Sequence, residues 1–346
     1  MFWMREYCCL YESKSCFDVH EQKHKSAKID RLLRIERKEQ KNQIKILLLG
    51  AGDSGKSTFL KQMKIIHNIH FEDKEIREYR RIIYENVVRG MQTLVDACVK
   101  LKIRLEDNYN YINGQNLIQT ECKDMEMQQF RSVAPLLNCL WKDSGIKLAF
   151  TRRREFQLAD SVEYYLNDLA RISKYSYLPN SKDILLCRKT TKGVSEVKIN
   201  INNIPFVFVD IGGQRAQRQF DQILMEDRKT NRLEESIQIY DTIINNNIFS
   251  NMLKILFLNK HDLLVKKIAD TTTNISWYYP KYTGDPHSVK EVEVFIAALF
   301  SAVKRDPSKK VFQHFTSTVD TENMTHVFSS IKGSILNKNV QNFTIL

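Results

Sequence analysis

A glycine-rich loop is the strongest chemical signal in the sequence. Residues 50–58 read GAGDSGKST and fill every fixed position of the pattern G-x-x-x-x-G-K-[ST]. Glycines let such a loop curl so that its backbone N–H groups and the next helix N-terminus face anionic phosphates. Lys56 can then reach the outer phosphates, and the Ser57 hydroxyl is placed to ligate Mg²⁺. The spacing therefore predicts a site for the phosphates of a nucleotide.

Two further polar motifs follow predicted strands. Residues 210–214 read DIGGQ, in which Asp210 can hold Mg²⁺ through a water molecule. Gly213 leaves room for a terminal phosphate, and Gln214 can orient an attacking water. Residues 259–262 read NKHD and fit N-K-x-D, whose carboxylate can accept both donors on the edge of guanine. Adenine does not present its donors in that arrangement, so the second motif predicts selectivity for guanine.

Arg188 and Thr191 have the residue types of two more catalytic groups. An arginine can neutralise charge in the transition state of phosphoryl transfer, and a hydroxyl can complete the coordination of Mg²⁺. Either residue alone is more often a surface or capping group. Their order and spacing relative to the other motifs favour the functional interpretation.

Apolar periodicity predicts the elements that would position these motifs. Residues 44–49 form an apolar run before the glycine-rich loop, and a helix follows the loop to about residue 69. Helical periodicity dominates from about residue 71 to 180, without strand-like alternation. Two strands then follow, joined by a hairpin turn at Asn202-Asn203. The later predicted elements are a helix through Leu233 and Ile244, a buried strand at 255–258, a helix near 288–304, a strand at 311–315 and a helix near 321–337.

Composition argues against several classes of protein. The chain has 346 residues, 42% of them hydrophobic, as is ordinary for a globular protein. Its apolar runs fall short of the roughly 18 residues that span a bilayer, and charges interrupt the stretch where a secretory signal would lie. Seven cysteines without disulfide-framework or zinc-site spacing favour a reducing compartment. The net charge is +12, and much of the positive charge lies within the first 80 residues; without a nucleic-acid motif, this distribution favours an anionic membrane as partner.

Residues 1–43 are predicted to form an exposed arm. Cys8, Cys9 and Cys16 lie near the N-terminus, ahead of a charged helical stretch. S-acylation at these cysteines together with a basic patch would supply the two signals that stable anchoring requires, and buried or free thiols are the alternative. Apolar residues at 29, 32 and 33 form a narrow stripe that can dock a partner, or the helix can simply be solvated.

Taken together, these motifs resemble those of the alpha subunits of heterotrimeric G proteins. The resemblance runs from about residue 25 to 340, and its clearest stretches are 46–63, 154–161, 183–193, 210–215, 224–228, 257–263 and 284–287. Residues 46–49, 59–60 and 220–233 look most like the subclass that activates Rho through exchange factors.

The resemblance implies an α/β fold with two domains and an arm. A Ras-like P-loop GTPase domain would comprise residues 44–70 and 184–346, and an inserted all-helical domain would comprise residues 71–183. Residues 1–43 would be the arm for membrane and beta-gamma contact. The implied activity is a GDP/GTP switch that requires Mg²⁺, hydrolyses GTP slowly and holds two mobile loops with GTP.

The resemblance also implies partners and a location. The beta-gamma dimer would bind the N-terminal helix, a seven-transmembrane receptor would bind the C-terminus, and a Rho guanine-nucleotide exchange factor would be the effector. The protein would lie at the cytoplasmic face of the plasma membrane, partly in the cytoplasm, and would bind no nucleic acid.

The site residues implied by the resemblance have distinct roles. Arg188 would act as an arginine finger and Gln214 would position water, while Ser57 and Thr191 would ligate Mg²⁺. Asp160 and Ser161 would close over the nucleotide from the helical insert. The full nucleotide-binding set is Asp53, Ser54, Gly55, Lys56, Ser57, Thr58, Asp160, Ser161, Leu185, Leu186, Cys187, Arg188, Lys189, Thr190, Thr191, Asp210, Ile211, Gly212, Gly213, Gln214, Asn259, Lys260, His261, Asp262 and Thr318.

Three positions depart from the family pattern. Asp53 stands where the family usually has a glutamate that pairs with the switch arginine, so the hold on Arg188 would be weaker. Thr318 replaces the usual alanine beside the guanine ring, and its side chain must find room. Residues 339–346 are unlike the usual C-termini, so they do not identify a receptor.

The largest departure follows Arg218. In the family a helix and an apolar strand come before Phe-Asp-Gln, whereas here Gln219 runs directly into Phe220. About 20 residues, enough for one helix and one strand, are missing. That central strand would lie beside the phosphate-loop strand, so its loss would leave ladder hydrogen bonds unpaired on both neighbours.

Two explanations of this gap compete. One is a splice product or a gene model that lacks an exon, which would fold poorly or be inactive. The other is a sheet that closes by re-pairing the strand at 254–258, and we favour the first. Two functions follow: a GTP-hydrolysing transducer, or a truncated, non-hydrolysing decoy that sequesters a receptor or effector.

Overall fold

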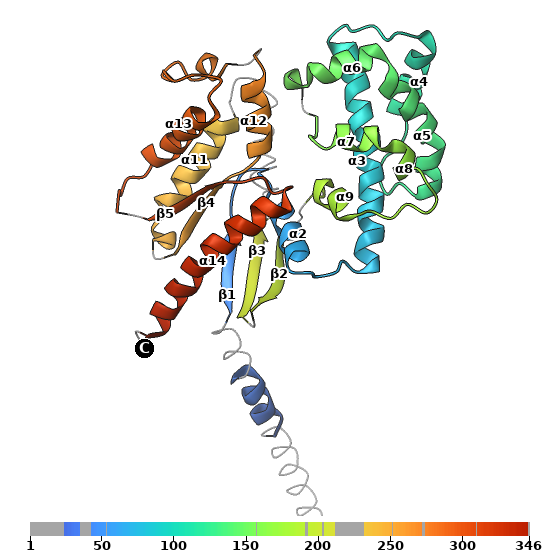
Figure 1. The fold of residues 1–346 in the computed structure, drawn as a ribbon. Helices are drawn as coiled ribbons and strands as arrows, with labels where there is room; N and C mark the ends of the chain where they lie inside the picture. The colour runs from blue at the N-terminus through green and yellow to red at the C-terminus, as the bar shows by residue number, and fades with distance from the viewer. Residues whose placement is uncertain are drawn as a thin grey trace, which may run out of the picture. The chain divides into compact units, whose positions relative to one another are not determined.

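The computed structural model is a mixed α/β structure (Figure 1). Its chain divides into two compact units. The structure describes residues 24–34, 43–52, 54–156, 158–190, 193–202, 204–211, 232–250, 252–271, 274–308 and 310–344. The first unit combines Met1–Leu47 with Glu196–Val209, and the second combines Leu48–Ser195 with Asp210–Leu346. Within the described ranges, no helix has the length and apolar content needed to cross a membrane.

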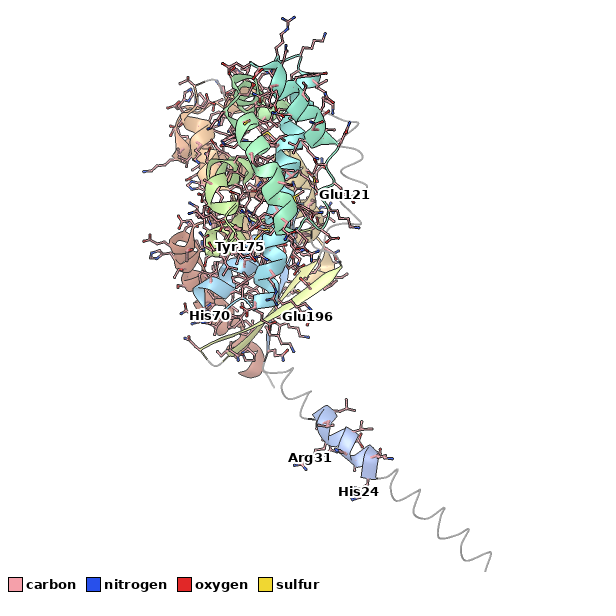
Figure 2. All side chains as sticks on the ribbon, turned by 90° about the vertical axis from the view of Figure 1, so that its right-hand side faces the viewer. His24, Arg31, His70, Glu121, Tyr175 and Glu196 are labelled. Carbon is pink, nitrogen blue, oxygen red and sulfur yellow. The ribbon has the colours of Figure 1, made fainter. Side chains whose placement is uncertain are left out.

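The first unit is built on a three-stranded sheet in the order β1-β3-β2. Its strands are β1 (Ile44–Leu48), β2 (Val194–Ile201) and β3 (Ile204–Ile211). Two residues join β2 to β3, and Asn202 has φ 52°, a left-handed conformation that tight hairpins use and asparagine tolerates. The predicted hairpin is therefore confirmed. Residues 24–34 form an exposed helix from which His24 and Arg31 project (Figure 2).

The second unit begins with α2 and a group of helices gathered around α3 (Figure 1). These elements are α2 (Lys56–Ile66), α3 (Asp73–Lys100), α4 (Asn108–Ile118), α5 (Met127–Lys142), α6 (Ser144–Thr151), η1 (Arg153–Glu155), α7 (Val162–Asn167), α8 (Leu169–Ile172) and α9 (Ser181–Leu186). A capping box between Glu72 and Glu75 starts α3. No strand lies among the described residues from 73 to 186, as the helical periodicity predicted.

The helices from α3 to α9 share one apolar core. Side chains that are 0% exposed fill it: Ile83, Tyr84, Val87, Val88, Met91, Leu94, Leu117, Phe130, Leu137, Leu140, Ile146, Ala149, Tyr165 and Ile172. Tyr84 of α3 stacks on Phe130 of α5 with ring centroids 4.1 Å apart. The i, i+3, i+4 spacing on α3 places its apolar residues on one face, so the sequence pattern and the packing agree.

A buried carboxylate fixes the start of α9. Asp183 is 0% exposed and accepts two hydrogen bonds of 2.8 Å from the Arg171 guanidinium. It also accepts hydrogen bonds from the Tyr164 and Tyr177 hydroxyls and the Asn180 backbone N–H. Burial alone would raise the pKa of Asp183, but the bonds from Arg171 and the other donors lower it below the usual value. The carboxylate is therefore charged at neutral pH and anchors α9.

The rest of the second unit is built on a two-stranded parallel sheet. β4 (Lys254–Leu258) pairs with β5 (Val311–Phe315), and Lys254 lies opposite Val311 in the register. The other elements are α11 (Arg232–Ile244), η2 (Asn247–Phe249), α12 (His261–Ala269), η3 (Ile275–Trp277), α13 (Val289–Ala302) and α14 (Thr321–Thr344). The predicted elements are present, and α14 extends beyond its predicted end.

The burial of β4 differs from the prediction. The apolar run predicted a buried strand, whereas every residue of β4 is half-buried. β4 pairs with β5 alone among the described strands, and β1 belongs to the other sheet. A strand is covered fully only when both its edges and both its faces are occupied. The described part of the chain therefore shows no pairing of the strand at 254–258 other than that with β5, and re-pairing of this strand, one of the two explanations for the gap after Arg218, stays a prediction.

Candidate functional site

The glycine-rich loop makes a tight turn before α2. Gly55, the residue that caps α2, has φ 102°, a conformation that L side chains rarely adopt. A Cβ at Gly55 would also clash with the side-chain amide nitrogen of Asn259. The Lys56 ammonium donates to the carbonyl oxygens of Gly50 and Ala51, each at 2.8 Å. The loop thus holds a lysine against its own backbone, where nucleotide phosphates would bind.

Ser57 and Asp210 meet at the start of α2. The Ser57 hydroxyl donates to Asp210 Oδ2 at 2.8 Å. Asp210 is 1% exposed, and its Oδ1 has no hydrogen-bond partner among the described residues. A buried carboxylate oxygen without a partner is costly unless a cation or its water molecule satisfies it. These two side chains therefore fit Mg²⁺, with Ser57 as a direct ligand and Asp210 acting through water.

The loops after β4 and β5 meet because parallel strands end at the same edge of a sheet. The Thr318 N–H donates to Asn259 Oδ1 at 3.0 Å, and Asn259 Nδ2 donates to the Ser54 carbonyl oxygen at 2.8 Å. The Ser317 hydroxyl donates to Asp262 Oδ1 at 3.0 Å, which orients that carboxylate. Asn259 therefore ties both loops to the phosphate-binding loop.

Thr318 finds the room that its side chain requires. It is 7% exposed, and its hydroxyl oxygen lies 3.1 Å from Asn259 Nδ2, close enough to accept a hydrogen bond. The departure from alanine is therefore accommodated within the loop as an additional polar contact.

An ion pair joins the helical group to the loop after β4. Lys260 Nζ lies 2.8 Å from Asp160 Oδ2, and the side chains are 38% and 57% exposed. Such an exposed pair contributes little to stability. The neighbouring Ser161 is buried, at 6% exposure. His261 points elsewhere, and its Nε2 lies 2.5 Å from Glu293 Oε1 of α13.

The segment Leu185–Thr190 leaves the end of α9 and becomes exposed at Arg188. Leu185 and Cys187 are buried at 5% and 3% exposure, whereas Arg188, Lys189 and Thr190 are exposed. Burial raises the pKa of Cys187 to about 11, so its thiol is protonated and unreactive at neutral pH. Leu186 is half-buried.

Sequence reasoning missed several residues that contact this segment, among them Lys61 and Asn86. Lys61 of α2 donates to the carbonyl oxygens of Ile184 and Cys187, and Asn86 of α3 forms hydrogen bonds with the backbone of Arg188. Lys61 is only 6% exposed, and burial lowers its pKa. The sequence offers little signal for Lys61 beyond a charged residue within a run of α2 that is otherwise buried, Phe59 to Met63.

Several predicted site residues lie outside the described part of the chain. They are Asp53, Thr191, Gly212, Gly213 and Gln214. Ile211 ends β3, and only its backbone is described. The pairing of Asp53 with Arg188, the Mg²⁺ ligand at Thr191 and the water-orienting role of Gln214 therefore stay predictions. The described residues that the structure brings together are those of the phosphate loop, Asp210, and the loops after β4 and β5.

Comparison with known proteins gives a consistent result. A family model described as "G-protein alpha subunit" matches residues 23–219 and 218–335. The human guanine nucleotide-binding protein subunit alpha-12 is 44% identical over 348 aligned residues, covering 94% of this chain and 91% of the relative. The mouse subunit alpha-13 is 43% identical over 349 residues, with 93% and 92% covered. The alpha-12 subunit of Caenorhabditis elegans is 39% identical over 351 residues, with 94% and 98% covered.

Proposed function

This chain belongs to the G-protein alpha subunit family, and on that premise we propose that it is a GDP/GTP switch that hydrolyses GTP and transmits a signal. The observation that carries the proposal is the junction at Asn259. This side chain bonds to the backbone of the phosphate loop at Ser54 and to the loop after β5 at Thr318. A base held by Asp262 and a phosphate chain held near Lys56 would thereby belong to one nucleotide.

Each group of residues has a chemical role in this proposal. Asp262, oriented by Ser317, would accept the donors of guanine, and Lys56 would neutralise phosphate charge. Bound Mg²⁺ would supply charge neutralisation at the phosphates, with Ser57 and Thr191 as ligands. Arg188 would stabilise the transition state, and Gln214 would orient water for attack.

We propose the domains and partners that the resemblance to the family implies. Residues 44–70 and 184–346 would form the GTPase domain, residues 71–183 the helical insert and residues 1–43 the arm. The exposed stripe at residues 29–33 supports beta-gamma docking on the helix 24–34. A seven-transmembrane receptor, a Rho guanine-nucleotide exchange factor and the cytoplasmic face of the plasma membrane complete the proposal. Acylation would occur at Cys8, Cys9 or Cys16.

The alignments support a second candidate function, that of a non-hydrolysing decoy. The two matched segments of the family model meet at residues 218–219, where the helix and strand are proposed to be missing. The alignment to the Caenorhabditis elegans relative spans 351 positions, whereas 94% of this chain is about 325 residues. Such a chain could bind a receptor or effector without completing the GTPase cycle.

Nucleotide binding and turnover distinguish the two functions. We expect the purified chain to bind a fluorescent GDP analogue stoichiometrically with Mg²⁺, and excess ATP not to compete. Asp262→Asn should weaken guanine binding about 100-fold or more, because two hydrogen bonds to a charged acceptor are lost. Xanthosine diphosphate should bind this variant better than the wild type, which controls for misfolding.

Single-turnover hydrolysis then tests catalysis. Gln214→Leu should bind GTP normally and hydrolyse it at least about 100-fold more slowly than the wild type. Binding without hydrolysis in the wild type would favour the decoy, and no binding by a folded chain would contradict both the switch and the proposed site.

A further inference from the structure

A buried lysine caps the end of α9. Lys61 Nζ donates to Ile184 O at 2.9 Å and to Cys187 O at 2.6 Å. The ammonium also lies 5.1 Å from the centre of the Tyr79 ring. The Lys61 side chain is only 6% exposed, and its described contacts are two backbone carbonyls and an aromatic ring face. A positive charge at a helix C-terminus is favourable because the last carbonyls point toward it.

An asparagine on a different helix holds the next residue. Asn86 Oδ1 accepts from the Arg188 N–H at 3.0 Å, and Asn86 Nδ2 donates to the Arg188 carbonyl oxygen at 3.2 Å. The same Nδ2 donates to Ile82 O within α3 at 2.7 Å, which fixes the side-chain orientation. The amide therefore pairs with the backbone of one residue as a strand would, although no strand is present there.

Together these contacts hold consecutive residues from two directions. Lys61 holds the backbone at Cys187 from α2, and Asn86 holds the backbone at Arg188 from α3. The Arg188 side chain is exposed, and its direction depends on the backbone that carries it. An arginine that stabilises a transition state needs that backbone in one place, because small misplacements are costly in rate.

We propose that Lys61 and Asn86 are positioning residues that together clamp the backbone of Cys187 and Arg188 and so aim the Arg188 guanidinium at the reacting phosphate. This inference rests on the proposed GTPase function for its effect on rate, but the clamp itself is a structural claim. Lys61 belongs to the helix that follows the phosphate loop, so the clamp links the phosphate loop to the segment that carries Arg188.

Single-turnover hydrolysis in two backgrounds tests the effect on rate. At saturating GTP, Asn86→Ala and Lys61→Met should each slow hydrolysis about tenfold. In an Arg188→Ala background the same substitutions should change the rate by less than about twofold, because the side chain that they aim is gone. Equal slowing in both backgrounds, or no slowing in either, would overturn the proposal.

Gln92→Ala is the matched control. Gln92 also lies on α3, and its amide donates to the backbone carbonyls of Leu117 and Thr120 at 2.8 and 3.0 Å, within the helical group. Removing the Gln92 amide loses hydrogen bonds to backbone carbonyls, as the test substitutions do, but none of these bonds involves Arg188. This variant should hydrolyse GTP at the wild-type rate, and a tenfold loss here would mean that general destabilisation explains the others.

Alkylation of Cys187 tests the clamp without any hydrolysis. Iodoacetamide labelling, read by mass spectrometry of the peptide, should be at least about tenfold faster in Asn86→Ala and Lys61→Met than in Gln92→Ala, since release of the backbone exposes a thiol that is 3% exposed. If the wild type does not hydrolyse GTP, the proposed function fails while this readout still decides the clamp. Equal labelling in all three variants would overturn it.

Discussion

The helical region (residues 73–186) and the strand region (residues 232–344) bury their apolar residues to different extents. The helical region has a continuous set of side chains at 0% exposure, among them Tyr84 and Phe130. The core of the strand region ranges from Ile244 and Val292 at 1% to Tyr240 at 9%, and all of β4 is half-buried.

The difference follows from how each element satisfies its backbone. A helix makes its hydrogen bonds internally, so a helical group can close its core with its own residues. A strand needs neighbours on both edges and layers on both faces, and β4 has only β5 as a partner among the described strands. The comparison teaches that the helical region closes its core with its own residues, whereas the described residues of the strand region leave β4 half-buried.

Paired core truncations should give the largest effect. Tyr84→Ala should cost about 3–5 kcal/mol in the free energy of unfolding, because it removes a fully buried ring stacked on Phe130. Phe257→Ala in half-buried β4 should cost about 1–2 kcal/mol. Urea denaturation followed by circular dichroism measures both.

Tyr84→Phe is the control for the larger truncation. The Tyr84 hydroxyl is buried without a hydrogen-bond partner in the described residues, so its removal should be neutral or slightly stabilising. Equal losses for the two alanine variants would break the contrast between the regions.

The charge of Asp183 should have the next largest effect. Asp183→Asn should cost the helical region about 2–3 kcal/mol, because the Arg171 guanidinium loses the carboxylate that it contacts through two nitrogens. Asp168→Asn removes a 41% exposed partner of the same arginine and should cost less than about 1 kcal/mol. Thermal denaturation of both variants compares their losses of stability. A larger loss for Asp168→Asn than for Asp183→Asn would refute the anchoring role of Asp183.

Mild acid should produce the smallest change in stability. It should destabilise the strand region at a higher pH than the helical region. Burial lowers the pKa of His314 on β5, and burial together with Lys332 lowers that of His67 after α2. The unfolded chain therefore binds more protons as pH falls below about 6.5, and stability is lost from that pH downward. The lowered pKa of Asp183 also makes stability fall with pH, but in a more acidic range, because its contribution persists until the pH falls below about 3.9.

Hydrogen exchange at about pH 5.5, corrected for intrinsic rates, checks this order. Protection of β5 should fall relative to neutral pH while protection of α3 is retained. His314→Phe should reduce the change in β5. Loss of α3 protection before that of β5 would contradict the expected order.

Local pattern predicted most elements and motifs, and it failed where burial depends on distant residues. The phosphate loop, the helical group and the hairpin at Asn202 follow from spacing within a few residues, and the structure has them. The half-burial of β4 did not follow from its sequence. An apolar run indicates that a strand has side chains suited to burial, but it does not indicate which other elements will pack over them.

The sequence by itself determined the inventory of chemical groups: a phosphate loop, a guanine-type N-K-x-D motif, Asp210 at a strand end and an arginine after the helical group. Short motifs carry that information because their chemistry needs neighbours close along the chain. Only the tertiary structure decided how Asn259 ties three loops together and how Lys61 and Asn86 hold the backbone before and at Arg188. The physical reason is distance along the chain, since Lys61 and Cys187 are 126 positions apart and only folding brings such donors and acceptors together.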